Sequence, residues 1–356
     1  MQTRRDAVAL LLGATLGATL PATASRGWTR VPFRDVSDPL GVRFGMRGEG
    51  TRLLTDISRL EPITPTAEFF IRTGYALDHE PSWPLLIDGR VSRRLTLTRD
   101  ELARAATPIG AVTMECAGNY GAGGYGLIST ATWRGISCAS LFARVAPAAD
   151  SLVEIRGVNR YEPHAARQAT SWIFDPRALV AAGAFLTVEM NGEPLTRDHG
   201  APFRLVVPGW YGCCSIKWVR EIVFVRRDAQ PSRHMYDYAT RTHQPAIFDL
   251  AREFEPAVVD VAAVATRLER RGRDYRLSGI LWGGRSREYT LAVSADGFHT
   301  RDVTRVRRPN VNGWASWSVP FHPPSRRDLS ITCGVIEPSE RQRRLDSGWY
   351  ERKVRL

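Results

Sequence analysis

Short runs of alternating apolar residues constrain the fold of the last third of this chain. Apolar side chains recur at every second position in runs at 275–279, 289–293 and 329–335. Turn signals such as Gly283-Gly284 and Asp296-Gly297 separate these runs, with almost no helical pattern between them. Strands of this length and spacing are typical of a β-sandwich of about one hundred residues. The sequence therefore predicts a β-sandwich at the C-terminal end.

The preceding part of the chain mixes short helices and strands. A capping box at 98–101 and an N-cap followed by proline at Asp175-Pro176 each open a short helix. Alternating or apolar runs at 151–158 and 185–190 indicate strands. Because the elements follow no βαβ rhythm, this part favours an α+β fold over a doubly wound parallel sheet.

The first residues are typical of an export signal. Arg4-Arg5 precede an uncharged run at 7–20, and Ala22-Thr23-Ala24 offers a small-residue cleavage site. The arginine pair predicts twin-arginine export to the periplasm in the folded state, and a general secretory signal or a retained anchor is the alternative. No later segment approaches about eighteen uncharged apolar residues, so we expect no membrane span in the mature chain. The predicted parts are the export signal at 1–24, the α+β domain at 25–250 and the β-sandwich at 251–356.

Charge and composition narrow the classes of partner. The 356 residues carry a formal net charge of +12, with 43% hydrophobic and 24% charged residues, as in an ordinary globular protein. The arginines are scattered, and no basic stripe with interleaved aromatic residues indicates nucleic acid binding. An anionic small molecule or an acidic protein is the more economical partner.

The five cysteines offer one candidate metal ligand. An odd number in an exported chain leaves at least one thiol unpaired, and no C-x-x-C-H motif for covalent haem is present. The adjacent Cys213 and Cys214 could pair only with strain, so we expect them to be loop residues. Cys116 stands between a short apolar run and a glycine-rich loop. A thiolate there could hold a redox metal whose other ligands come from an organic cofactor, although free cysteine is more often a small buried hydrophobe.

A second polar cluster follows at 191–204, with a glycine-containing loop at 208–218 after it. His199 and Arg204 stand five residues apart, and Lys217 ends the loop. These cations and the backbone N–H groups of the loop could bind a phosphate or a pterin. The alternative is that His199 and Arg204 only brace a turn.

Taken together, these segments resemble the sulfite oxidase family of molybdenum enzymes. The resembling pieces span nearly all of residues 65–240, and the β-rich tail resembles the family's C-terminal immunoglobulin-like dimerisation domain. The matching motifs are FFIR at 69–72, ECAGN at 115–119, LISTATWRG at 127–135, EMNGEPLTRDHGAPFRLVVPG at 189–209 and SIKWV at 215–219.

The resemblance implies one molybdenum per chain, bound by the dithiolene of a molybdopterin and by Cys116. It places Arg72 beside the oxo group of the metal, where it would hold an anionic substrate, and Tyr238 at the active-site tyrosine. His199 and Arg204 would contact the pterin phosphate or ring. Arg72 and Cys116 would also contact the cofactor. The other implied cofactor contacts are Phe70, Ile71, Thr73, Asn159, Ser215, Ile216 and Lys217, with Asn159 where the family usually has an acidic residue.

Three departures from the family fall near the substrate. Animal-type members follow CAGN with two arginines, whereas this chain has Tyr120-Gly121. Their tryptophan is absent from the loop at 121–126, and Gly74 stands where the family often has a histidine. The metal-binding motif is therefore matched more closely than the substrate pocket.

We therefore expect a periplasmic, molybdopterin-dependent oxidoreductase with sulfite dehydrogenase-like oxygen-atom transfer. It would pass electrons to an external carrier such as cytochrome c, and it would form a homodimer through the C-terminal domain. The alternatives are a periplasmic reductase of sulfoxide-type substrates on the same core and a non-catalytic secreted binding protein.

Overall fold

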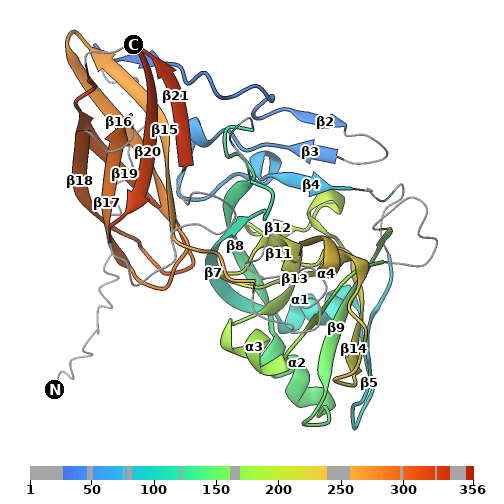
Figure 1. Ribbon diagram of the computed structural model, residues 1–356. Coiled ribbons are helices and arrows are strands. Elements are labelled where there is room, and N and C mark those ends of the chain that lie inside the picture. The colour runs from blue at the N-terminus through green and yellow to red at the C-terminus, as the bar shows by residue number, and fades with distance from the viewer. Residues whose placement is uncertain are drawn as a thin grey trace, which may run out of the picture.

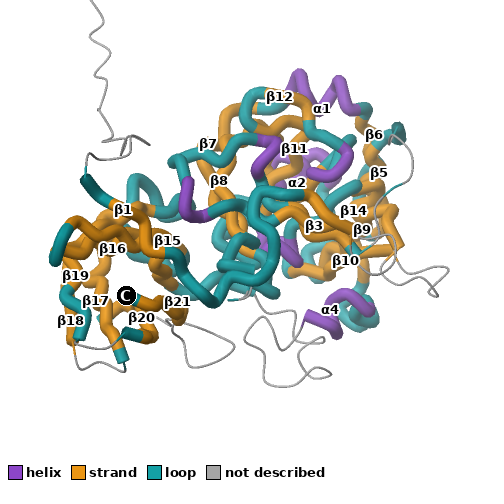
Figure 2. Tube along the Cα trace, turned by 90° about the horizontal axis from the view of Figure 1, so that it is seen from above, coloured by secondary structure: helices purple, strands orange, loops and turns teal. Residues whose placement is uncertain are grey.

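The computed structural model describes residues 27–45, 51–74, 77, 82–119, 121, 123–160, 169–238, 257–296, 300–324, 327–336 and 350–356. The predicted export signal and most of the expected boundary near residue 250 lie outside these ranges. The described part of the chain contains mostly strands and few helices, arranged as a larger unit beside a two-sheet C-terminal unit (Figures 1 and 2).

One antiparallel sheet of the larger unit carries the cysteine loop. Its strand order is β12-β11-β8-β7, and β13 also pairs with β11. Its bounds are β7 Thr107–Glu115, β8 Ile128–Ser137, β11 Phe185–Met190, β12 Glu193–Pro194 and β13 Arg204–Val206. Cys116 follows the last residue of β7, as the apolar run before it predicted.

A second five-stranded sheet forms the opposite part of the larger unit. Its order is β10-β9-β14-β5-β6, in which β14 and β5 are parallel and the other pairs are antiparallel. Its bounds are β5 Leu85–Gly89, β6 Leu95–Leu97, β9 Leu152–Arg160, β10 Ala169–Phe174 and β14 Val219–Val225. A small third sheet contains β2 Arg43–Gly45, β3 Thr51–Leu53 and β4 Ile71–Thr73.

Short helices connect these sheets. The capping box of Thr98 and Glu101 opens α1 Arg99–Ala105, and Asp175 caps α3 Pro176–Ala181. The sequence analysis missed α2 Cys138–Val145, which buries Cys138, Leu141, Phe142 and Val145. The remaining helices are α4 Arg233–Tyr238 and the 3₁₀ turns η1 Ile57–Arg59, η2 Thr66–Glu68, η3 Arg197–His199 and η4 Gly212–Cys214.

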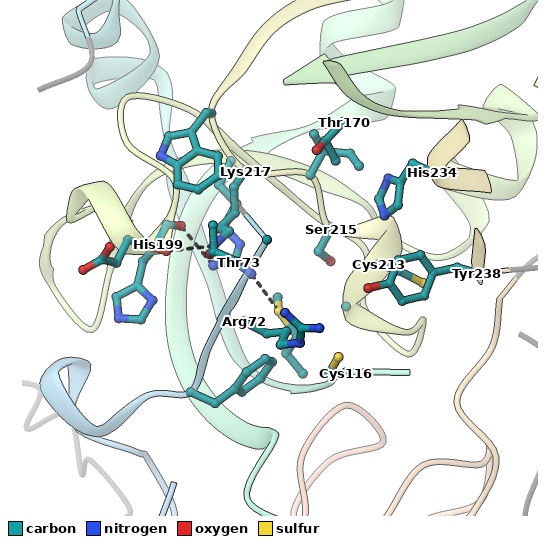
Figure 3. A pocket seen from close by; sticks show the side chains of 18 residues that line it. Arg72, Thr73, Cys116, Thr170, His199, Cys213, Ser215, Lys217, His234 and Tyr238 are labelled. Atoms are coloured by element: carbon teal, nitrogen blue, oxygen red, sulfur yellow. Dashed lines mark hydrogen bonds between the residues drawn. The ribbon is translucent and has the colours of Figure 1, made fainter. Parts of the chain in front are cut away.

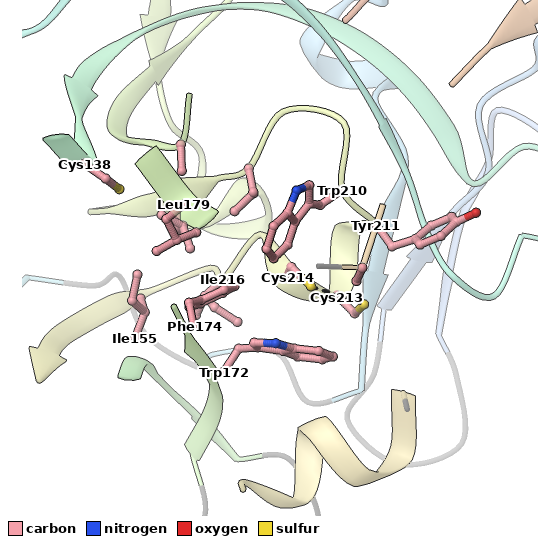
Figure 4. Close-up of a cluster of buried hydrophobic side chains, with 14 of the residues drawn as sticks. Cys138, Ile155, Trp172, Phe174, Leu179, Trp210, Tyr211, Cys213, Cys214 and Ile216 are labelled. Carbon is pink, nitrogen blue, oxygen red and sulfur yellow. Dashed lines mark hydrogen bonds between the residues drawn. The ribbon is translucent and has the colours of Figure 1, made fainter. Parts of the chain in front are cut away.

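The adjacent cysteines differ from the expectation that they lie in a loop. Both belong to η4 and are buried, with their sulfur atoms 4.0 Å apart. Figure 4 shows them between Trp172 and Trp210 in the main hydrophobic core. All five cysteines are free thiols and buried.

The C-terminal unit consists of two four-stranded sheets that share one apolar core. We call this unit the sandwich. Strand β19 alternates buried and exposed residues along its whole length, as the period-two pattern requires. The first sheet contains β1 Thr29–Val31, β15 Ala262–Arg271, β16 Asp274–Trp282 and β19 Ala315–Phe321, and the second contains β17 Glu288–Ala295, β18 Thr300–Arg307, β20 Asp328–Val335 and β21 Tyr350–Arg355. Since β1 pairs with β15, the sandwich also contains a strand from the N-terminal part of the chain.

Candidate functional site

A cavity of about 310 Å³ lies in the larger unit between the cysteine loop, β4, η3, η4 and α4. We call it the central cavity, and Figure 3 shows it from close by. Its lining residues are Phe70, Arg72, Thr73, Gly74, Met114, Cys116, Thr170, Asp198, His199, Arg204, Gly212, Cys213, Ser215, Ile216, Lys217, Trp218, His234 and Tyr238.

Cys116 faces this cavity and is 7% exposed. Its backbone N–H donates to the carbonyl of Leu127 at 2.9 Å, and its Sγ accepts from the N–H of Gly118 at 3.4 Å. Burial raises the pKa of the thiol, whereas the Gly118 N–H and the charge of Arg72 act in the opposite direction. Burial therefore disfavours the thiolate that a metal requires, and a bound metal cation would stabilise it.

Arg204 is more buried than Arg72 and Lys217, the other two cations that line the central cavity. It is 5% exposed, donates from one terminal nitrogen to the carbonyl of His199 at 2.9 Å, and donates from the other to Sδ of Met114 at 2.8 Å. Burial lowers its pKa to about 10, and its Nε has no hydrogen-bond partner among the described residues. A buried guanidinium without a carboxylate at these contacts suits an anionic ligand.

Lys217 is held close to Arg204 by the turn around residue 200. Its ammonium group donates to Oγ1 of Thr73 and to the carbonyl of Asp198, the latter at 3.1 Å. Burial, followed by the charge of Arg204, lowers its pKa to about 7. Gly200 has φ +106°, and a Cβ there would lie 3.0 Å from Cβ of Lys217, so this turn requires glycine.

His199 and Ser215 complete this part of the cavity wall. Nε2 of His199 lies 3.0 Å from the carbonyl oxygen of Thr66, and its ring stacks edge-on against Phe69 at 5.4 Å. Oγ of Ser215 accepts from the N–H of Val207 at 3.2 Å. These contacts fix both side chains within the fold.

Most residues that the sequence indicated come together here; Ile71 does not, and the side chain of Asn159 lies outside the described part of the structure. Phe70, Arg72, Thr73, Cys116, His199, Arg204, Ser215, Ile216, Lys217 and Tyr238 all line the central cavity. Ile71 lies in β4 beside Arg72 and is buried, but it is not a lining residue, because neighbouring side chains of a strand point to opposite faces. Asn159 lies in β9, and the structure does not describe its side chain.

The sequence analysis missed several lining residues, of which His234 and Met114 are the most informative. His234 precedes Tyr238 by four residues in α4, a spacing that places two side chains on one helix face. Its ring packs edge-on against Trp172 at 5.4 Å and against Tyr238 at 5.1 Å. Met114 stands two residues before Cys116, so strand alternation could have predicted that it faces the same cavity.

The residues present fit a molybdopterin. Asp198 is the only carboxylate among the described lining residues, against the cations Arg72, Arg204 and Lys217. No cluster of three or more His, Cys, Asp or Glu side chains that could hold a metal occurs in the described ranges. A metal at Cys116 would therefore take most of its ligands from an organic cofactor, and the three cations would face the anionic groups of that cofactor.

Comparisons with known proteins agree with this geometry. Residues 73–233 match the family model described as oxidoreductase molybdopterin binding domain. The chain is 29% identical to the sulfite oxidase of Gallus gallus over 78% of its own length and 67% of that protein. It is 26% identical to the mitochondrial sulfite oxidase of Rattus norvegicus, covering 78% of this chain and 56% of that protein. It is 28% identical to an NADPH nitrate reductase of Neurospora crassa, covering 60% of this chain and 26% of that protein.

A solved structure shares the fold over most of the chain. The structure of the sulfane dehydrogenase SoxCD from Paracoccus pantotrophus superimposes with a TM-score of 0.69 at 21% identity, covering 88% of this chain and 90% of that one. Fold, cavity and family match together define a molybdopterin-dependent oxidoreductase. Among these enzymes, the chain is similar to the sulfite oxidases. The alternative of a non-catalytic binding protein is therefore set aside.

Proposed function

We propose that this protein catalyses oxygen-atom transfer of the sulfite dehydrogenase type, with one molybdenum cofactor per chain. The observation that carries the proposal is that Cys116 faces the same cavity as Arg72, Arg204 and Lys217. A soft metal ligand thus lies beside cations that suit both an anionic cofactor and an anionic substrate. When bound, the molybdopterin supplies a metal that changes oxidation state as an oxo group is transferred.

The side chains of the cavity would divide this work. Arg204, His199 and Lys217 would bind and orient the anionic part of the cofactor, while Cys116 holds the metal. Arg72 would hold an anionic substrate with a fixed positive charge. Tyr238 would donate a hydrogen bond or a proton from its hydroxyl group close to the reacting oxygen.

A specific observation supports a reductase of sulfoxide-type substrates as the second candidate. Gly74 lines the central cavity, and a Cβ built there would meet no atom within 4 Å. A neutral substrate with an organic group could use this space, and Tyr120-Gly121 here stand where animal-type relatives have two arginines. Sulfite as the substrate is supported mainly by the likeness to the two sulfite oxidases.

Metal analysis and a substrate screen test the proposal. We expect about one molybdenum atom per chain, by the cofactor chemistry of the family, in protein from a molybdenum-replete host. Sulfite oxidation with a redox dye or cytochrome c as acceptor would support the first candidate, and turnover of methionine sulfoxide alone would replace it with the second. Folded protein without molybdenum, inactive in both assays, would contradict both candidates.

The cellular setting is proposed from the sequence. Residues 1–24 would direct twin-arginine export to the periplasm, where an external carrier such as cytochrome c would accept the electrons. No helix within the described ranges is long and apolar enough to span a membrane. Retention of a folded reporter in the cytoplasm after Arg4→Lys and Arg5→Lys would support this route, and unchanged export would contradict it.

The division of the chain at residue 250 and the role of the sandwich also belong to the proposal. We propose an immunoglobulin-like C-terminal domain at 251–356 that forms a homodimer, supported by its two sheets and the apolar core that they share. Sedimentation of the purified protein as a dimer would support this role, and a monomer at micromolar concentration would contradict it.

A further inference from the structure

Strand β7 separates two cavities. Met114 and Cys116 line the central cavity, whereas Thr113 and Glu115 line a second cavity of about 480 Å³. Trp282 of the sandwich also lines this second cavity, which therefore lies where the sandwich meets the larger unit. Alternation of side chains along the strand produces this arrangement. The residue next to the proposed metal ligand thus faces the sandwich.

Glu115 is hydrogen-bonded to both sheets of the sandwich. Its side chain belongs to a residue that is 1% exposed. Its Oε1 accepts from the hydroxyl of Tyr350 at 2.6 Å, and its Oε2 accepts from Nε1 of Trp282 at 3.0 Å. Trp282 ends β16 in one sheet, and Tyr350 begins β21 in the other. A buried carboxylate is costly unless donors satisfy it, so these bonds hold the three residues together.

The same carboxylate also reaches the cysteine loop. Nδ2 of Asn119 lies 3.4 Å from Oε1 of Glu115, and Oδ1 of Asn119 accepts from the N–H of Leu127 at 3.0 Å. The N–H of Asn119 donates in turn to the carbonyl of Cys116 at 3.0 Å. Asn119 therefore connects Glu115 with both ends of the segment from Cys116 to Leu127.

Aromatic packing between the loop and the sandwich supports this connection. The ring of Tyr350 meets that of Tyr125 edge-on at 4.3 Å and lies 5.3 Å from Trp282. The hydroxyl of Tyr125 donates to the carbonyl of Glu351 at 3.1 Å. The sandwich thus contacts the glycine-rich part of the loop as well as the residue before Cys116.

We propose that Glu115 is a positioning residue through which the sandwich fixes the orientation of the Cys116 loop. The inference rests on the proposed function, in which Cys116 holds the metal. The carboxylate acts through Asn119 and the backbone, and it touches neither substrate nor cofactor. A sulfur ligand must be held within a narrow range of orientations, and a supporting shell of hydrogen bonds provides this.

Hydrogen exchange in the full chain without cofactor tests the connection. Tyr350→Phe removes one bond to Glu115 and should accelerate amide exchange at Cys116, Asn119 and Leu127 by about two- to tenfold. Tyr289→Phe is the matched control: Tyr289 is also 2% exposed in the sandwich, and its hydroxyl accepts from the N–H of Ser286. We expect no selective change in the loop for this control.

Two results would overturn the inference. Unchanged loop exchange in Tyr350→Phe would show that the bond does not restrain the loop. Equal acceleration in both variants would show only a general loss of stability. Because this measurement needs no molybdenum, its outcome does not depend on the proposed function. If Tyr350→Phe selectively accelerates exchange in the loop but the protein never binds molybdenum, the proposed function is contradicted and the connection between Glu115 and the loop is retained.

The holoenzyme supplies the second measurement. Tyr350→Phe, Trp282→Phe and Glu115→Gln should each shift the sulfur-to-metal absorption band and lower kcat more than they raise KM, by about ten- to hundredfold in kcat as for other supporting residues of metal ligands. Tyr289→Phe should leave the band in place. An unshifted band in all three variants would contradict the positioning role.

Discussion

The two ends of the central cavity are built differently. Figure 3 shows His199 and Lys217 toward one side of the cavity and His234 and Tyr238 toward the other, with Arg72 and Cys116 between them. At the first end, His199 and Lys217 are fixed by contacts to backbone carbonyls of the larger unit. At the second end, the wall is the short helix α4, whose Met235 accepts from the N–H of Ile173 at 3.3 Å.

We expect this difference to separate cofactor binding from substrate choice. The first end consists of motifs that match the family, and it suits a cofactor common to its members. The second end contains His234, which belongs to none of those motifs. Cofactor binding and substrate choice should therefore respond to different substitutions.

The largest effect is expected at the residue between the two ends. Cys116→Ser should retain the pterin, because His199, Arg204 and Lys217 remain, but lose more than about 100-fold in turnover, beyond the loss typical of supporting residues. Pterin content and sulfite turnover measure the two effects separately. Cys138→Ser, which removes another fully buried thiol away from the cavity, is the control. Normal turnover in Cys116→Ser would refute the metal-ligand assignment.

Arg72→Ala should affect substrate binding more than cofactor content. The loss of a charge-assisted contact predicts a rise in KM for an anionic substrate of about 10- to 100-fold, with molybdenum content unchanged. Steady-state kinetics and metal analysis check this. Arg94→Ala removes an exposed arginine paired with Asp88 and should leave both quantities unchanged. Loss of molybdenum in Arg72→Ala would instead place Arg72 with the cofactor-binding end.

Lys217→Met should affect cofactor retention more than substrate binding. Removal of the buried ammonium group should weaken cofactor retention about tenfold, since one charge-assisted contact is lost. The KM of the molecules that keep the cofactor should change little. Equilibrium dialysis of the pterin and kinetics normalised to molybdenum measure these quantities. Lys353→Met in β21 is the control, and equal cofactor retention in both variants would contradict the role of Lys217.

A further expected effect is a pH dependence of the stability of the cofactor-free chain. Burial and Arg204 lower the pKa of Lys217 from 10.5 to about 7, so between these values the unfolded chain binds a proton that the folded chain does not. The Lys217 contribution to the free energy of unfolding therefore rises with pH through this window, and the full penalty applies below about pH 7. Urea unfolding from pH 6 to 10 should show a flatter profile for Lys217→Met. Parallel profiles would contradict this contribution.

Local signals in the sequence predicted local structure well. The capping box of Thr98 and Glu101 and the run at 185–190 correspond to α1 and β11, because each depends on neighbouring residues. The pairing of β1 with β15 could not be predicted in this way, since it joins residues more than two hundred positions apart. The bonds from Trp282 and Tyr350 to Glu115 are non-local for the same reason.

The candidate site shows the same limit. Family motifs indicated Cys116, His199 and Arg204, and the structure places all three at the central cavity. His234 and Thr170 belong to no motif that the sequence analysis used, and only the fold brings them to the cavity wall. Sequence identifies the residues that relatives share, whereas packing decides which further side chains complete the wall.

The contacts of Glu115 also order events in time during synthesis. Tyr350 leaves the ribosome 235 residues after Glu115, an interval of roughly 10–50 s at the usual rate of translation. During that interval the segment after Cys116 has been synthesised, but the hydrogen bond from Tyr350 to Glu115 cannot yet form. The hydrogen bonds that support the Cys116 loop are therefore completed only after the loop itself has been made.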